Sequence, residues 1–131
     1  MADIPENFRY LVTRTTLAIA HLALTLADGS PQVSPIWFDF DGTHFIFNTA
    51  RGRVKDMVMR RHGKVAFSIL DPQDPYQYML VRGPIVSETE EGGYEGICDL
   101  NEKYHGDRNF PKRPEVRVIY KVLPEKIFVS Q

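Results

Sequence analysis

Cysteine is almost absent from the 131-residue sequence, in which Cys98 is the only one. A lone cysteine can form no internal disulfide and cannot begin a cysteine-ligated metal cluster. The four histidines lie far apart and also lack the spacing of a zinc site. We therefore expect a protein of a reducing compartment, the cytoplasm, with no metal and with Cys98 as a small buried side chain.

The sequence also lacks an excess of charge of either sign, because 16 basic residues stand against 17 acidic ones. Such a chain has no long-range field for nucleic acid or anionic membranes, so any anion site must be local. The most apolar run, 16–27, is too short to span a bilayer, and the first eight residues do not resemble a secretory signal. We expect one domain over residues 1–131, with neither a membrane nor a nucleic acid as partner.

Motifs of several large enzyme classes are missing as well. The sequence contains no phosphate loop ending in Gly-Lys-Ser/Thr and no Gly-x-Gly-x-x-Gly after a strand. Its serines lie in no nucleophile elbow. These absences argue against a nucleotide triphosphatase, a Rossmann dehydrogenase and a serine hydrolase.

Alternating and β-branched segments dominate what is present. Asp28-Gly29 and Asp41-Gly42 have the composition of tight hairpin turns. They predict three consecutive antiparallel strands, as in a meander, over 15–26, 32–40 and 44–49. The remaining pattern predicts helices at 5–12, 52–62 and 90–104, and strands at 64–70, 77–89 (broken near Gly83-Pro84), 116–122 and 126–129.

The segment Asn48-Thr49-Ala50-Arg51-Gly52-Arg53-Val54-Lys55 carries the clearest chemical signal. A strand ends there and a helix begins, so backbone N–H groups, a hydroxyl and three cations are brought together, which is what a phosphate needs. The alternative is the solvated face of a surface helix, the usual meaning of a charge run. Cations at a helix start oppose the helix dipole, which favours a bound anion over this alternative.

Aromatic residues offer a second, weaker signal. Trp37 and the pair Tyr76 and Tyr78 could stack on a ring system or fill the core. We take Trp37 and Tyr78 as candidate substrate-binding residues. No residue has the partners that would mark it as catalytic.

Several segments, in this order and spacing, resemble those of the pyridoxamine phosphate oxidase-like flavoproteins, and among them the deazaflavin (coenzyme F-420)-dependent reductases. They are 28–38, 47–55, Arg60-Arg61, Asp71-Pro72, Pro75-Tyr76 and 81–83. One stretch departs from the pattern. Relatives often read Lys-x-Arg-Asn-Leu-Arg-Arg, whereas this chain has apolar Met57 and Val58 at two of the polar positions.

The resemblance implies a mainly β protein, a six-stranded antiparallel split β-barrel of the FMN-binding type. It also implies a homodimer with two cofactor sites between the subunits. The ring would lie against the second and third strands and the phosphate against the following cations. The cofactor-binding residues implied in this way are Gln32, Val33, Ser34, Asn48, Thr49, Ala50, Arg51, Arg53 and Lys55.

The function implied is an oxidoreductase in which reduced coenzyme F-420 transfers hydride to a small organic acceptor. One alternative is an FMN-dependent enzyme of the pyridoxamine phosphate oxidase type. Another is a non-catalytic protein that binds a flavin or a tetrapyrrole in the same pocket. The identity of the substrate is not encoded in any motif.

Overall fold

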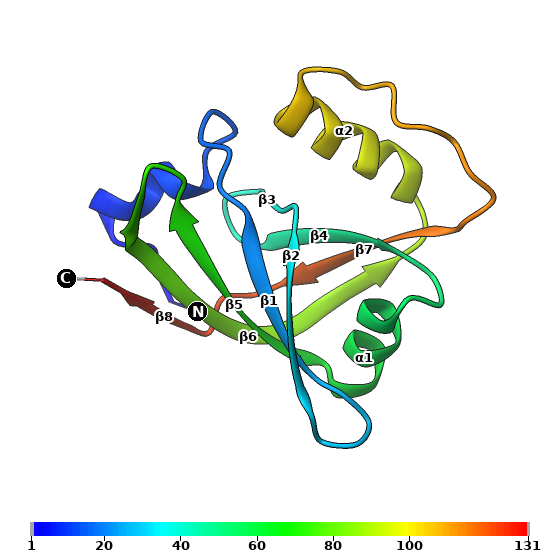
Figure 1. The fold of residues 1–131 in the computed structure, drawn as a ribbon, viewed down its shortest axis with the longest axis horizontal. Coiled ribbons are helices and arrows are strands. Elements are labelled where there is room, and N and C mark those ends of the chain that lie inside the picture. The colour runs from blue at the N-terminus through cyan, green and yellow to red at the C-terminus, as the bar shows by residue number, and fades with distance from the viewer. Residues whose placement is uncertain (1, 131) are drawn as a thin grey trace.

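Strand β6 (Asp74–Thr89) is the longest element and joins the two halves of the sheet (Figure 1). The computed structural model describes residues 2–130, in which the strand order is β2-β1-β5-β6-β7-β4-β3, with β8 also paired to β6. All pairings are antiparallel. The other elements are η1 (Glu6–Val12), β1 (Ala20–Thr25), β2 (Pro31–Ile36), β3 (Asp39–Phe40), β4 (Phe45–Ala50), α1 (Val54–His62), β5 (Lys64–Asp71), α2 (Gly93–His105), β7 (Arg117–Val122) and β8 (Lys126–Val129).

The two halves of the sheet meet where β6 bends. Its first part pairs with β5 and β8, and its pairing with β7 shifts register between Ile85 and Ser87. A Cβ atom on Gly83 would lie 1.9 Å from the carbonyl oxygen of Leu123, so the chains can cross this closely only at a glycine. The predicted break near Gly83-Pro84 is therefore confirmed as a bulged bend within one continuous strand.

The hydrophobic core lies between these two halves. The ring of Phe67 from β5 packs edge-on against Phe45 and Phe47 from β4, with centroids 5.0 and 5.1 Å away. Such aromatic pairs add to the free energy gained from burial alone. One end of the core is covered by η1, a 3-10 helix, through Phe8 and Leu11, both buried, which confirms the helix predicted at 5–12.

The sheet does not close into a complete barrel. Strand β2 pairs with β1 alone, while β4 pairs along its whole length with β7 and at only two residues with β3. Both predicted hairpins form, β1 with β2 and β3 with β4, but the predicted middle strand is split, so the three strands do not make one continuous meander. The predicted strand 32–40 is interrupted at Trp37 and Phe38, because Phe38 is buried in the core and Trp37 stacks on Tyr104 of α2.

The predicted fold class is confirmed: the protein is mainly β, antiparallel and of the split-barrel type. In the described residues 2–130 the strands number eight rather than the six implied by the resemblance. Two short additions account for the difference, because β3 is separated from β2 and β8 adds itself to the edge of β6.

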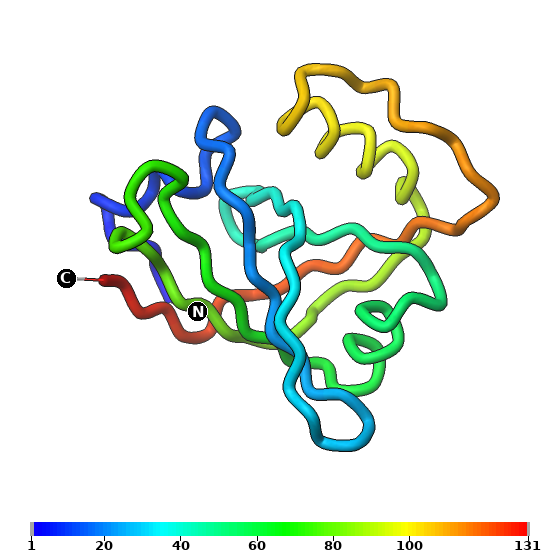
Figure 2. The backbone as a smooth tube through the Cα atoms, viewed as in Figure 1, coloured from blue at the N-terminus to red at the C-terminus, as the bar shows by residue number. Residues whose placement is uncertain are grey.

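Helix α2 lies outside the barrel, and a long arm, residues 106–116, returns the chain to β7 (Figure 2). The helix begins at Gly93 instead of the predicted residue 90, with Gly92 at φ 75° as its N-cap. A Cβ on Gly93 would lie 2.2 Å from the carbonyl oxygen of Arg117. Glycine lowers the helix propensity of this segment, but at Gly93 it allows the helix to approach β7 closely.

Three further features of residues 2–130 concern the expectations from composition. Cys98 is buried on α2, as predicted. No helix there combines the length and the apolar character needed to cross a membrane. In the same part of the chain, no group of three or more Cys, His, Asp or Glu side chains is placed to hold a metal ion.

Gly93→Ala should destabilise the protein by about 1–3 kcal/mol, since an overpacked Cβ forces backbone shifts. Urea unfolding measures the difference in stability. Glu95→Ala, at an exposed position in the first turn of the same helix, is the control and should cost less than about 1 kcal/mol, because only a favourable contact with the helix dipole is lost. A Gly93→Ala protein as stable as the wild type would contradict the close approach.

Candidate functional site

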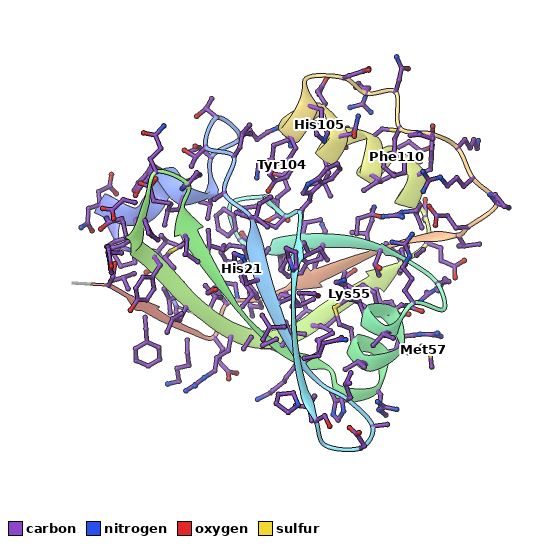
Figure 3. The ribbon with its side chains drawn as sticks, viewed as in Figure 1. His21, Lys55, Met57, Tyr104, His105 and Phe110 are labelled. Atoms are coloured by element: carbon purple, nitrogen blue, oxygen red, sulfur yellow. The ribbon has the colours of Figure 1, made fainter. Side chains whose placement is uncertain are left out.

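The candidate site is a pocket at the open seam of the sheet, between β2 and β4. Its volume is about 390 Å³, and it is bounded by α1, α2 and the arm that follows α2. Figure 3 shows Lys55 at the start of α1 and Phe110 beside α2. The residues lining it are Pro35, Ile36, Trp37, Asn48, Thr49, Arg53, Lys55, Ile97, Phe110, Arg113 and Arg117.

One wall of the pocket follows the edge of β4. Only Phe45 and Ile46 pair with β3, so among residues 2–130 the stretch Phe47–Ala50 has a strand partner on the β7 side alone. An unpaired strand edge presents backbone N–H and C=O groups. These groups can bind a planar ligand with donors and acceptors along its rim.

Four cationic side chains line the pocket: Arg53 and Lys55 at the start of α1, and Arg113 and Arg117 from the arm and β7. One carboxylate lies among them. Glu115 Oε2 accepts a hydrogen bond from Arg53 Nη2, and its Oε1 accepts one from Arg117 Nη1, both at 3.1 Å. The pocket therefore keeps an excess of positive charge, which suits an anionic group.

Asn48 fixes the position of Arg117 at the back of the pocket. The Oδ1 atom of Asn48 accepts a hydrogen bond from Arg117 Nε at 2.8 Å, and its Nδ2 donates to the carbonyl oxygen of Gly93 at 2.8 Å. Both side chains are buried. Burial lowers the pKa of Arg117, and hydrogen bonding to Glu115 acts in the opposite direction.

Arg51 lies on the other side of the β4–α1 corner and does not line the pocket. Its guanidinium donates to three carboxylates, with distances of 2.7 Å to Glu90, 2.8 Å to Asp56 and 2.5 Å to Glu88. These partners, led by Glu90, raise its pKa. In this chain Arg51 braces the corner, and its hydrogen-bonding groups face carboxylates of the protein.

Asp56 is the centre of that brace. Its carboxylate is fully buried and accepts hydrogen bonds from Tyr120 Oη at 2.5 Å, Gly52 N at 3.0 Å and Arg60 Nη2 at 3.1 Å. Burial by itself raises the pKa of Asp56. The hydrogen bonds, led by that of Tyr120, outweigh burial and hold the pKa below its ordinary value of 3.8.

Trp37 forms the apolar wall opposite these cations. Its ring stacks on Tyr104, with 5.1 Å between centroids and 15° between planes. Beneath this pair, the buried Lys103 amine donates to the carbonyl oxygen of Phe38 at 2.7 Å and lies 4.1 Å from the Phe38 ring. Burial lowers the pKa of Lys103 to about 8. These contacts hold Trp37 in a fixed orientation at the pocket.

The structure brings together only part of the predicted site. Of the candidate cofactor residues, Asn48, Thr49, Arg53 and Lys55 line the pocket, and so does the candidate substrate residue Trp37. The others lie elsewhere. The residues that do not line it are Gln32, Val33, Ser34, Ala50, Arg51 and Tyr78.

The residues outside the pocket have identifiable surroundings. Gln32 and Val33 are exposed on β2, whereas the Ser34 hydroxyl is buried with no hydrogen-bond partner among the described residues. Ala50 is buried next to Arg117 in the ladder, and Tyr78 pairs with Leu70 near the start of β6.

The departure from the family pattern falls on α1. Met57 is exposed on its outer surface, as Figure 3 shows, and Val58 is buried against the core. Neither residue lines the pocket. The two apolar substitutions therefore change the packing and the outer face of the helix, and leave this pocket wall intact.

Sequence reasoning missed the contribution of the arm. Phe110, Arg113 and Arg117 are more than 50 residues from Lys55 in the chain, and no motif links them. The available signal was the cationic, proline-bounded stretch 111–114 just before a strand. It becomes informative only once β7 is known to pair with β4.

Comparison with known proteins gives this geometry a family. A family model described as pyridoxamine 5′-phosphate oxidase matches residues 5–131. No curated protein matches at a significant level. A solved structure named F420 reductase is 29% identical, with a TM-score of 0.84 over 95% of this chain and 98% of that chain.

More distant structures share the fold. HupZ of Group A Streptococcus is 18% identical, with a TM-score of 0.69 over 97% of this chain and 94% of that chain. The conserved protein Rv2991 of Mycobacterium tuberculosis is 17% identical, with a TM-score of 0.70 over 98% of this chain and 86% of that chain.

Asp56→Asn should lower the free energy of unfolding at pH 7 by about 3–5 kcal/mol, the cost of breaking a buried charged network. Because the folded pKa of Asp56 is depressed, its stabilising contribution is complete above the ordinary value of 3.8 and is lost as the pH falls through the folded pKa. Urea unfolding at several pH values should show the two proteins converging in acid. Asp99→Asn, at an exposed ion pair, should cost at most about 1 kcal/mol. A difference as large at pH 2.5 as at pH 7 would contradict this role for the carboxylate.

Proposed function

Because the chain belongs to the pyridoxamine 5′-phosphate oxidase family, we propose that it is an oxidoreductase that uses reduced coenzyme F-420 to transfer hydride to a small organic acceptor. The observation that carries the proposal is the pocket at the seam of the sheet. It combines an unpaired strand edge, apolar walls and four cations in one place. A flat ring with an anionic tail matches these three features.

The residues of the pocket fit a phosphorylated flavin-type cofactor. The edge of β4 would bind the polar rim of the ring, and Trp37 and Ile97 would supply apolar contact. Arg53 and Lys55 would hold the phosphate at the start of α1, where the helix dipole also favours an anion. When bound, the cofactor supplies the hydride chemistry, while the protein supplies binding, orientation and electrostatics.

Two observations favour coenzyme F-420 over FMN. The segment 48–55 resembles the deazaflavin branch, and the structure named F420 reductase is similar over almost the whole of both chains. FMN remains the second candidate because the family is named for pyridoxamine 5′-phosphate oxidase, and the same phosphate site would serve it.

A homodimer is part of the proposal. The outer face of β1, β5, β6 and β8 has a hollow of about 450 Å³ that carries exposed Val33, Leu80 and Phe128. Apolar patches of this kind mark contact surfaces. The patch reaches β2 at Val33, only two residues before the stretch 35–37 that lines the pocket, so contact with a second copy would lie next to the cofactor.

The cofactor site is tested by titrating FMN and coenzyme F-420 into the wild type, Arg53→Ala and Lys55→Ala. Each substitution should weaken the preferred cofactor at least tenfold, or about 1.4 kcal/mol, because a charged hydrogen bond to phosphate is lost. Cofactor fluorescence or absorbance measures the affinity. Hydride transfer to a panel of acceptors is then assayed with the cofactor that binds.

The matched control is Arg61→Ala. Arg61 is exposed near the end of the same helix and does not line the pocket, so its loss should change the affinity less than twofold. Unchanged affinity in both Arg53→Ala and Lys55→Ala would overturn the site assignment.

The dimer is tested by Leu80→Asp, which places a charge within the apolar face. We expect the wild type to be dimeric in light scattering at micromolar concentration and Leu80→Asp to be monomeric, since a buried unpaired carboxylate is costly. Leu17→Asp is the control, because Leu17 and Leu80 are equally exposed, at 45%, and Leu17 lies outside this face. A monomeric wild type, or a dimeric Leu80→Asp protein, would contradict the proposed contact.

A further inference from the structure

Arg117 is a buried guanidinium with a free side that opens to the pocket. The residue is 8% exposed and lines the pocket wall. Its Nε and Nη1 atoms donate to Asn48 and Glu115, and its guanidinium lies 5.6 Å from the centre of the Phe110 ring. No protein acceptor within residues 2–130 receives a hydrogen bond from Nη2. The Nη2 side of the planar guanidinium, which is held in place by its other hydrogen bonds, is thus available to a ligand.

The charge around Arg117 is incompletely balanced. Its one carboxylate partner, Glu115, is shared with Arg53. Lys55 and Arg113 line the same pocket, and neither forms an ion pair with a carboxylate in the described part of the chain. Taking a cation out of water is costly unless it is paired. An incoming anion would complete the pairing of Arg117.

The geometry of Glu115 also places the two arginines close together. Arg53 and Arg117 bind the two oxygens of a single carboxylate, each at 3.1 Å. Two guanidiniums held on one carboxylate are near enough to share another small oxyanion on their free sides. A phosphate is of this size and accepts several such hydrogen bonds.

Asn48 has a different part in this arrangement. Its amide oxygen faces Arg117 and its amide nitrogen faces Gly93, so both ends of the side chain are used within the protein. It is 6% exposed. Asn48 therefore determines where the Arg117 guanidinium lies, and its amide is not directed at a ligand.

We propose that Arg117 directly contacts the phosphate of the bound cofactor, and that Asn48 is a positioning residue that acts through Arg117. This inference rests on the proposed function, because it concerns the anionic group of the same ligand. It assigns the phosphate site to two separate segments of the chain, the start of α1 and the start of β7.

The test compares ligands with and without phosphate. FMN and riboflavin, and coenzyme F-420 and its phosphate-free deazaflavin, are titrated into the wild type and Arg117→Met. Arg117→Met should weaken the phosphorylated ligand at least tenfold and the phosphate-free ligand less than twofold. Arg108→Met is the matched control, because Arg108 lies on the arm that leads to Arg117, pairs with Asp99 and lies outside the pocket. It should leave both affinities unchanged.

The positioning role is tested in the same pair of ligands. Asn48→Ala should reduce the preference for the phosphorylated ligand several-fold and should have no further effect on that preference in an Arg117→Met background. Glu115→Gln should keep or increase that preference, because it removes a negative charge that competes with the phosphate for Arg53 and Arg117. A purely structural role would weaken both ligands equally, so equal losses would overturn the positioning role.

The outcomes separate this inference from the proposed function. A wild type that binds neither flavins nor deazaflavins, or binds them without regard to phosphate, overturns both. A wild type that prefers the phosphorylated ligand, together with an Arg117→Met protein that keeps the whole preference, overturns only the role of Arg117. Should Arg117→Met fail to fold, Arg117→Lys is used, because it removes the guanidinium fork and the Nε donor while keeping the charge. The role of Arg117 is then tested by the same preference for the phosphorylated ligand.

Discussion

The buried carboxylate of Asp56 is the interaction on which the site depends. It joins the start of α1 to the backbone of Gly52, to Arg51 at the end of β4 and to Tyr120 in the middle of β7. A carboxylate with four donors in the interior tolerates little movement of any of them. The helix start is thereby held in one place, and with it the side chains that face the pocket.

The arginines of this corner divide into two kinds. Arg51 is surrounded by carboxylates and serves the fold, whereas Arg53 and Arg117 share one carboxylate and keep hydrogen-bonding groups for something else. Arg51 and Arg53 are only two residues apart in the sequence. Their different roles therefore come from the residues that surround each side chain in the fold. The positive charge that a pocket offers to a ligand is therefore what remains after the cations paired with carboxylates of the protein have been subtracted.

Much of the fold could be predicted from the sequence, because local signals were strong. Hairpin glycines and strand alternation were sufficient to predict most of the elements, and the family resemblance implied the fold class. Local sequence signals could not show whether the predicted strands form a meander. Whether the other edge of β4 pairs with β2 depends on the core packing of Phe38 and on the contact of Trp37 with Tyr104, and the β4–β7 pairing joins segments about 70 residues apart.

The part of the site that could be predicted is the part formed by one continuous segment of the chain. The run from Asn48 to Lys55 was found because helix-start cations are unusual. The arm and the start of β7 were not predicted as parts of the site. Arg113 and Arg117 can be assigned to the pocket only once β7 is known to pair with β4. The assignment of Asn48 also needed coordinates, because a buried amide that binds a ligand and one that holds an arginine look the same in a sequence.

The arm between α2 and β7 has one more consequence. It lies outside the barrel, and the glycines at the start of α2 allow its close approach to β7, while the hydrophobic core contains no residue from α2 or the arm. Insertions or exchanges within the arm therefore remove no side chain from that core. The fold thus separates the residues that stabilise the sheet from the residues of the arm that shape the entrance of the pocket.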